Sequence, residues 1–205
     1  MTTPTVLVMD LGGVTCRWLP DRRLAALTEL SGMSMSMIDQ LVFESGFDDA
    51  GERGRFTLEE FASQLVTTIG LRDEPAATEA VRAAWAQAFD PDARVLKLIR
   101  DAACRTALFT NNGPLLEVAL DEDLAEVGSV FDQLLFSWRL GVTKPDPLAY
   151  ARATERLEVE PGDVFFVDDS AANVEAAIAH GWQAHRYTNS LNLQAALSDI
   201  GLLGA

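Results

Sequence analysis

Short apolar runs recur along the chain, and each ends where polar or glycine-rich residues begin. Runs of three or four apolar residues bounded in this way are typical of strands that are buried on both faces of a parallel sheet. The pattern predicts four such strands, at residues 6–9, 107–109, 134–136 and 164–167. Residues 182–187 are a fifth candidate, since His180 and Gly181 precede them and a glycine often closes the helix before a strand.

Segments with a helical spacing of apolar residues lie between these runs. Each follows a residue or pair that can begin a helix, namely Asp90-Pro91, Asp146-Pro147 and Ser170. We therefore predict helices that carry residues 95–99, 148–157 and 171–179. Because the predicted strands and helices alternate, the expected fold class is α/β, with a doubly wound, Rossmann-like parallel sheet.

The segment 17–89 is different, because it contains no convincing strand. Four helical patterns fill it, over residues 20–30, 34–43, 57–69 and 75–89. Thr57 and Glu60 fit a capping box, in which each side chain satisfies a backbone amide of the first turn. Residues 46–54 have glycines and charges without a helical period, and we interpret them as a hinge or a substrate-facing edge. The predicted organisation is a core of residues 1–16 and 90–205 with an inserted helical subdomain of residues 17–89.

Composition narrows the class of protein. The length of 205 residues and the hydrophobic content of 48% suit one α/β domain with a modest insertion. Sixteen basic against 31 acidic side chains leave a formal charge of −15, so neither nucleic acid nor a membrane is an expected partner. No signal-peptide pattern or membrane span is seen, and a cytoplasmic location is expected. Cys16 and Cys104 lack metal-ligand spacing, and we expect reduced thiols.

Polar residues that can carry chemistry follow the predicted strands directly. Ligands of an open parallel sheet bind beyond the carboxyl ends of its strands, so these positions are the first candidates for a site. They are Asp10 after the first run, Thr110-Asn111-Asn112-Gly113 after the second, Lys144 after the third and Asp168-Asp169 after the fourth. Three carboxylates in one pocket would repel one another unless a cation were bound. A hard divalent ion with oxygen ligands, most simply Mg²⁺, resolves this conflict.

The order and surroundings of these residues resemble those of the haloacid dehalogenase-like hydrolase superfamily. Four motifs carry the resemblance: Asp10-Leu11-Gly12-Gly13-Val14, Phe109-Thr110-Asn111-Asn112, Lys144-Pro145-Asp146 and Val167-Asp168-Asp169-Ser170. Each motif is common by chance, but all four in this order and at strand ends form a specific signal. The helical insertion is similar to the cap of the family's first subclass, and the segment Glu52-Arg53-Gly54-Arg55-Phe56-Thr57 looks like one that is common in that cap.

The resemblance implies a Mg²⁺-dependent phosphatase that acts on a small phosphorylated molecule. Asp10 would be the nucleophile and would form an aspartyl-phosphate. The residues expected to hold Mg²⁺ are Asp10, the Gly12 carbonyl, Asp168 and Asp169. Those expected to bind the phosphoryl group are Thr110, the Asn111 amide and Lys144, with Asn173 in a supporting position.

Position 12 departs from the pattern of the family. Many of its phosphatases carry a second aspartate two residues after the nucleophile, which protonates the leaving oxygen and then activates water, whereas this chain has Gly12. General acid–base help of this kind is worth roughly 10²- to 10⁴-fold in rate. Three outcomes are open: substrates whose leaving groups need little protonation, substitution by a cap residue or water, or loss of activity. Some sugar-phosphate phosphatases of the family also have Gly here, which favours the first two outcomes.

Two other functions stay open at this point. A 2-haloacid dehalogenase also uses an Asp nucleophile and lacks the second aspartate, but it needs no metal and leaves Asp168-Asp169 unexplained. A catalytically weak or inactive member that binds a phosphorylated ligand or a partner is the other alternative, and Gly12 alone supports it. Arg17 and Trp18 are candidates for the entrance between core and cap. Both a monomer and a homodimer are compatible with the sequence.

Overall fold

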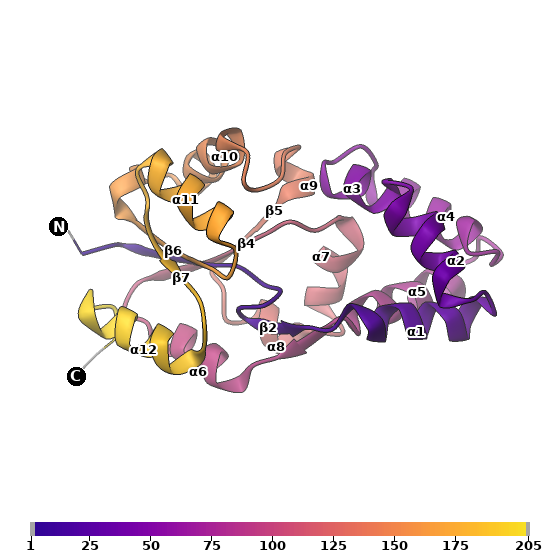
Figure 1. Ribbon diagram of the computed structural model, residues 1–205, viewed down its shortest axis with the longest axis horizontal. Helices are drawn as coiled ribbons and strands as arrows, with labels where there is room; N and C mark the ends of the chain where they lie inside the picture. The colour runs from indigo at the N-terminus through magenta and orange to yellow at the C-terminus, as the bar shows by residue number, and fades with distance from the viewer. Residues whose placement is uncertain (1–2, 204–205) are drawn as a thin grey trace.

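Five parallel strands form the central sheet of the computed structural model, which describes residues 3–203 (Figure 1). In spatial order they are β5 Gln133–Phe136, β4 Arg105–Thr110, β1 Val6–Met9, β6 Val164–Asp168 and β7 Gln183–Arg186. Neighbouring strands pair in parallel, and β1 lies in the centre. The four predicted strands and the fifth candidate are therefore confirmed.

The register of the three central strands defines the carboxyl edge of the sheet. Met9 lies level with Leu108 on β4 and with Val167 on β6. The backbone N–H of Asp10 continues the pairing by donating to the Val167 carbonyl oxygen at 2.9 Å. Asp10 therefore emerges between the ends of β4 and β6, where the predicted site residues of those strands also lie.

Helices cover both faces of the sheet, which confirms the doubly wound α/β prediction (Figure 1). Leu7 and Met9 belong to one apolar cluster, and Val6 and Val8 belong to a second. Because alternate residues of β1 are buried on opposite faces, its sequence reads as a continuous apolar run. The first face is covered by α6 Ala93–Asp101, α7 Pro114–Asp121, α8 Ala125–Gly128 and α12 Ser190–Asp199, and the second by α10 Pro147–Leu157 and α11 Ala171–His180. Two short turns are α9 Ser137–Leu140 and the 3₁₀ helix η2 Pro161–Asp163.

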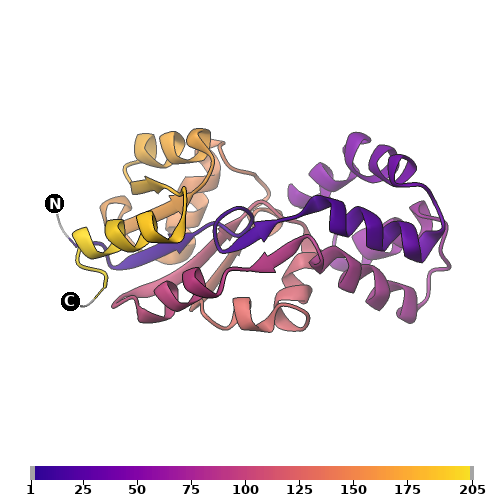
Figure 2. The ribbon, with the colours of Figure 1, turned by 60° about the horizontal axis from the view of Figure 1, so that its bottom comes forward.

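A second group of helices lies beside the sheet, at one end of the molecule (Figure 2). It contains α1 Pro20–Ser31, α2 Met35–Ile38, the π-helical η1 Asp39–Glu44, α3 Phe47–Glu52, α4 Leu58–Thr68 and α5 Pro75–Ala86. Buried apolar side chains fill its centre, with the rings of Phe61 and Trp85 edge to face at 5.8 Å. At the start of α4, Thr57 accepts from the Glu60 amide at 3.2 Å and donates its own amide to the Glu60 carboxylate at 2.8 Å. The predicted capping box is confirmed.

Two short strands connect the sheet to the helical group. β2 Cys16–Trp18 and β3 Phe89–Pro91 pair in an antiparallel ribbon, with Trp18 opposite Phe89. The expectation that residues 17–89 contain no strand was wrong at both ends of the segment. Three residues are too few to show the alternation that identifies a strand in a sequence.

Other predicted boundaries inside and after the helical group also differ. Residues 46–54 contain helix α3, which the sequence hides because Gly51 is a poor helix former. Glycine is required there, since a Cβ at this position would lie 2.3 Å from the Phe61 ring. The predicted helix 34–43 is divided into α2 and η1, and α5 ends at Ala86. Asp92, not Asp90, caps α6, because its side chain accepts from the first backbone amides of that helix.

The remaining sequence predictions concern membrane spans and thiols. Within the part of the chain that the structure describes, no helix has both the length and the apolar character needed to cross a bilayer. Cys16 and Cys104 are free, as expected. Cys16 is buried, and its burial raises the pKa of the thiol, so it packs as a small apolar side chain.

Candidate active site

A tight turn after β1 positions Asp10 at the carboxyl edge of the sheet. The Cys16 amide donates to the Leu11 carbonyl oxygen and the Gly13 amide to the Cys16 carbonyl oxygen, each at 2.8 Å. Gly13 has a φ of +84°, and a Cβ on it would lie 2.4 Å from Asp169 Oδ2. Only glycine therefore allows this turn to approach Asp169 so closely.

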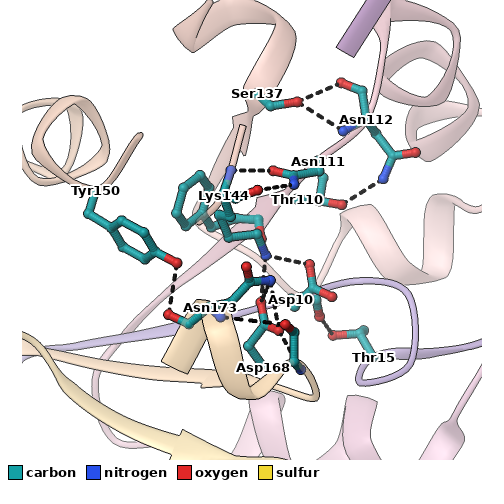
Figure 3. A network of polar contacts seen from close by, with 12 residues as sticks. Asp10, Thr15, Thr110, Asn111, Asn112, Ser137, Lys144, Tyr150, Asp168 and Asn173 are labelled. Atoms are coloured by element: carbon teal, nitrogen blue, oxygen red, sulfur yellow. Dashed lines mark hydrogen bonds and ion pairs between the residues drawn. The ribbon is translucent and has the colours of Figure 1, made fainter. Parts of the chain in front are cut away.

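A buried lysine connects the ends of three strands (Figure 3). Lys144 Nζ donates to Asp10 Oδ1 and to Asp168 Oδ2 at 2.7 Å each, and to the Phe109 carbonyl oxygen at 2.8 Å. The side chains of Lys144 and Asp168 are 1% and 0% exposed, whereas that of Asp10 is 12% exposed. Two carboxylates thus share one ammonium group, and Asp10 alone of the three reaches accessible space.

Asp168 is held in one orientation by groups on the helix that follows it. Asn173 Nδ2 lies 3.0 Å from each carboxylate oxygen of Asp168, and the Ser170 amide donates to Oδ1 at 2.9 Å. Tyr150 in turn donates its hydroxyl to the Asn173 carbonyl oxygen at 2.8 Å. These contacts orient the Asp168 carboxylate and fix the α11 N-terminus against α10.

The loop after β4 is tied to the segment that carries Lys144. The Asn111 side-chain amide exchanges two hydrogen bonds of 2.9 Å with the backbone of Lys144. Asn112 Nδ2 donates to Thr110 Oγ1 at 2.7 Å, while the Asn112 amide donates to Ser137 Oγ at 3.1 Å. The Asn111 side chain is therefore occupied, whereas Thr110 keeps its own hydroxyl proton to donate.

Three acidic side chains at this edge can hold a metal ion. Carboxylate oxygens of Asp10, Asp168 and Asp169 lie within 4.8 Å of one another. Burial raises the pKa of Asp10 to about 6, with Lys144 opposing the rise and Asp168 adding to it. Burial also raises the pKa of Asp169. Three acids face one lysine, so the set carries excess negative charge on oxygen donors, which suits a hard divalent cation such as Mg²⁺.

A cavity of about 290 Å³ opens from Asp10 toward the helical group. Its core side is formed by Asp10, Gly12, Thr110, Asn111, Asn112, Lys144 and Asn173, and its other side by residues that include Trp18, Arg23, Asp39, Phe43, Asp48, Glu52 and Phe89. The structure thus brings together the predicted site residues from four separate segments. Asp169 lies outside the cavity wall, close to Asp10.

The charged residues of the helical side of this wall are Arg23, Asp39, Asp48 and Glu52. The sequence placed Asp48 and Glu52 in a segment interpreted as a hinge or a substrate-facing edge but gave neither a role, and it missed Arg23 and Asp39. Asp48 and Glu52 are one helical turn apart on α3, so their spacing was a usable signal once a helix was assigned there. Arg23 gave no signal, because adjacent arginines on an amphipathic helix usually face solvent. Of the two predicted entrance residues, Trp18 lines the cavity, whereas Arg17 pairs with Asp90.

The chain belongs to the haloacid dehalogenase-like hydrolase family, whose model matches residues 34–181. Phosphatase MT3486 of Mycobacterium tuberculosis is 33% identical over 153 residues, which cover 72% of this chain and 70% of the relative. D-ribitol-5-phosphate phosphatase of Bacteroides thetaiotaomicron is 24% identical, with 95% of this chain and 97% of the relative covered. (S)-2-haloacid dehalogenase 4A of Burkholderia cepacia is 27% identical, with 65% and 58% covered.

A solved structure has the same fold. It is an Asp12Ala mutant of a family enzyme from Bacteroides thetaiotaomicron, in complex with magnesium and inorganic phosphate. The two chains superpose with a TM-score of 0.73 at 20% sequence identity, and the match covers 90% of this chain and 94% of the other. The likeness confirms the Rossmann-like core, which the alternation of predicted strands and helices had indicated.

Proposed function

We propose that this protein is a Mg²⁺-dependent phosphatase that transfers the phosphoryl group of a small phosphorylated metabolite to Asp10. The observation that carries the proposal is the buried cluster of Asp10, Lys144 and Asp168 beneath the cavity. A carboxylate can attack a phosphate only where positive charge offsets the repulsion between them, and Lys144 provides such a charge. Membership of the family and the phosphatases among its relatives support the same chemistry.

The proposed reaction consists of two displacements at phosphorus. In the first, an Asp10 oxygen bonds to phosphorus, the bond to the leaving-group oxygen breaks, and that oxygen takes up a proton from water or a cap residue. In the second, a water oxygen bonds to phosphorus and gives its proton to water or to the same cap residue. The bond between phosphorus and Asp10 then breaks, which releases inorganic phosphate and restores the carboxylate.

Residues around Asp10 are proposed to bind and orient the phosphoryl group. Lys144 Nζ keeps its charge 2.7 Å from Asp10 Oδ1. Thr110 donates its free hydroxyl proton to a phosphate oxygen, and Asn111 contributes its backbone amide, because its side chain is bonded to the Lys144 backbone. Asn173 is a positioning residue that acts through Asp168, both of whose oxygens it contacts.

The proposed Mg²⁺ ligands are Asp10, the Gly12 carbonyl, Asp168 and Asp169. Bound there, the ion supplies charge that offsets the repulsion between carboxylate and phosphate. These residues suit Mg²⁺ because the carboxylate oxygens of Asp10, Asp168 and Asp169 lie within 4.8 Å of one another, and Lys144 balances only part of their negative charge.

The absence of an acid at position 12 bears on the substrate. The nearest side chains to a Cβ built on Gly12 are the rings of Phe89 and Trp18, each 3.6 Å away. Aromatic carbon therefore borders the position from which many family members protonate the leaving group. We propose two ways in which the protein works without this acid. The first is a substrate whose leaving oxygen needs little protonation, such as an anomeric sugar phosphate or an acyl phosphate. The second is substitution of the acid by a cap residue or water, which a relative that acts on a polyol phosphate supports, because an alkyl ester needs a proton on its leaving oxygen.

The helical group of residues 17–89 is proposed to act as a cap on the core of residues 1–16 and 90–205. The cavity is lined from both parts, which supports a role of the cap in selecting the substrate. A cytoplasmic location and a monomeric or homodimeric state stay predictions.

A 2-haloacid dehalogenase is the second candidate, since such an enzyme is among the relatives. Its substrate carries a carboxylate, which the acidic excess at Asp10, Asp168 and Asp169 would repel unless a cation were bound. A member that binds a phosphorylated ligand without turnover is the third.

The test is a turnover panel of p-nitrophenyl phosphate and sugar phosphates, with Mg²⁺ or EDTA. We expect turnover with Mg²⁺, loss in EDTA, and loss in Asp10→Asn, while the exposed control Asp21→Asn keeps its activity. Turnover by Asp10→Asn would exclude the proposed nucleophile. Halide release from 2-chloropropionate in EDTA favours the dehalogenase, and thermal stabilisation by a phosphate ester without turnover favours the binding protein.

A further inference from the structure

Arg23 of α1 is a buried cation that uses only part of its hydrogen-bonding capacity. The residue is 3% exposed, and its Nε donates to the Trp85 carbonyl oxygen at 3.1 Å. Its Nη2 is buried, and no group of residues 3–203 accepts a hydrogen bond from it. Buried guanidinium N–H groups are normally satisfied, and Arg23 is also one of the residues that line the cavity, so its unused N–H groups point to a ligand oxygen.

Three aromatic rings hold the Arg23 guanidinium in place. Its central carbon lies 4.1 Å from the ring centroid of Trp85, 5.0 Å from that of Trp18 and 5.5 Å from that of Phe89. Burial lowers the pKa of Arg23 to about 10, with Asp48 and Glu52 opposing the fall, so the group keeps its charge at neutral pH. The rings thus present a fixed, charged donor to the cavity.

Acidic side chains share this half of the cavity with Arg23. Asp48 and Glu52 of α3 and Asp39 of η1 line it, and among the described residues no carboxylate forms an ion pair with Arg23. The donor and the acceptors are therefore separated by a gap instead of neutralising each other directly. Hydroxyl groups suit such a gap, because they accept from Arg23 and donate to a carboxylate.

The charge of this half of the cavity disfavours a second anion on the ligand. Burial raises the pKa of Glu52 to about 8, so this acid is largely protonated at neutral pH. Asp39 and Asp48 still outnumber the single charge of Arg23, so a carboxylate or a second phosphate would meet net repulsion. Trp18 and Phe89, whose rings are 5.0 Å apart, offer apolar faces to a carbon skeleton. The volume of about 290 Å³ is at the small end of the range for ligand sites.

We propose that Arg23, Asp48 and Glu52 form a subsite for the leaving group, and that this subsite selects phosphate esters of small, neutral, hydroxylated molecules. Arg23 donates to an oxygen of the leaving group, and the two acids accept from its hydroxyls. This inference rests on the proposed phosphatase activity and names its substrate class.

The test compares kcat/KM of Arg23→Met with that of the wild type on two kinds of substrate. Ribitol 5-phosphate and glucose 1-phosphate carry hydroxyls, whereas p-nitrophenyl phosphate does not. Loss of one hydrogen bond from a charged donor is expected to reduce kcat/KM for the hydroxylated esters roughly 10- to 100-fold. For Arg23→Met, kcat/KM on p-nitrophenyl phosphate and the inhibition constant of inorganic phosphate should stay within about threefold of the wild type. The control is Arg22→Met, because the Arg22 side chain is 58% exposed, and its kcat/KM should stay within about threefold of the wild type on both kinds of substrate.

Three further variants keep the test decisive if Arg23→Met fails to fold. Arg23→Lys retains the positive charge but lacks the several fixed N–H donors of a guanidinium, whereas Asp48→Asn and Glu52→Gln leave Arg23 intact. Each variant should lose kcat/KM on the hydroxylated esters selectively, but less than Arg23→Met does. Equal loss on both kinds of substrate would overturn the subsite. So would a wild type that prefers phosphoglycolate or a sugar bisphosphate to the neutral esters.

Failure of the subsite and failure of the proposed function are distinguishable. If the wild type turns over p-nitrophenyl phosphate but no hydroxylated ester, the subsite fails and the phosphatase stands. If the wild type turns over nothing, the phosphatase fails and the panel is measured by thermal shift. Stabilisation by ribitol 5-phosphate that Arg23→Met loses then supports the subsite, and no stabilisation overturns it.

Discussion

Replacing Lys144 by methionine tests the electrostatic balance of the site in the absence of metal. The lysine contacts Asp10 and Asp168 at 2.7 Å, and its side chain is 1% exposed. Methionine fills much of the same volume but leaves two buried carboxylates without their shared cation. Removing one partner of a buried ion pair costs about 3–5 kcal/mol of unfolding free energy. For a chain of this length, that loss corresponds to a fall in Tm of roughly 6–20 °C.

The loss should depend on pH in a defined direction. Lys144 opposes the rise in the pKa of Asp10, which nevertheless reaches about 6 through burial. Without the lysine the pKa of Asp10 rises further, so the folded protein holds a proton that the unfolded chain releases. Stability then falls as the pH rises from the ordinary range of an aspartate toward the new pKa. Lys144→Met should therefore be closer to the wild type at pH 5.5 than at pH 8.

The measurement is calorimetry and urea unfolding in EDTA at both pH values. Lys97→Met is the matched control, because Lys97 is 72% exposed and pairs with Asp101 one helical turn away. We expect that control to stay within about 0.5 kcal/mol of the wild type. A Lys144→Met protein that melts within about 2 °C of the wild type at pH 8 would refute the reasoning, because the buried charges would then need no cation.

Two further predictions concern backbone geometry and a buried acid. Gly13→Ala should cost about 2–3 kcal/mol in urea unfolding, since it combines a positive φ with a Cβ 2.4 Å from Asp169 Oδ2. Gly32→Ala is the control, because Gly32 has a φ of +72° but no described atom lies within 4 Å of its Cβ position, and it should cost about 1 kcal/mol. Equal losses for the two variants would contradict a close approach of Gly13 to Asp169. Burial, and then the charges of Asp48 and Asp49, raise the pKa of Glu52 to about 8, so the folded protein holds this proton more tightly than the unfolded chain does. The free energy of unfolding of the wild type should therefore fall by about 2 kcal/mol between pH 5 and pH 8.5, a value reduced for solvent screening. Glu52→Gln should lack this part of the pH dependence, and an unchanged dependence would show that Glu52 titrates normally.

The sheet and the core side of the site were readable from the sequence for the same reason. A strand buried on both faces is continuously apolar, as in Val6–Met9, and the first polar residue after it marks the carboxyl edge of the sheet. Asp10 and Asp168 were found in this way, and the parallel register then brings them together. In an open parallel sheet, the end of an apolar run in the sequence therefore marks the place where ligands bind.

The other half of the cavity was not readable, because it depends on packing between segments. Arg23 differs from its neighbour Arg22 only in which side of α1 meets Trp85 and the ribbon strands, and residue type alone does not decide this. Glu52 sits at the end of a helix whose glycine conceals the helical period. Short ribbon strands carry too few residues for any periodicity. These features follow from tertiary contacts, which one sequence does not encode in a local pattern.

The antiparallel ribbon has a consequence for how this molecule could be re-engineered. The chain enters the helical insert at Trp18 and returns from it at Phe89, and these residues lie opposite each other in the ribbon. The Leu19 amide donates to the Ala88 carbonyl oxygen beside them at 2.8 Å, so the insert is a loop whose two ends already meet. Its length and content can therefore be exchanged without altering the spacing of the sheet that it leaves and rejoins. A graft at this junction would keep the aromatic pair beside Gly12 and replace Arg23, Asp48 and Glu52 as a unit, which makes the insert a natural module for transplanting selectivity between scaffolds.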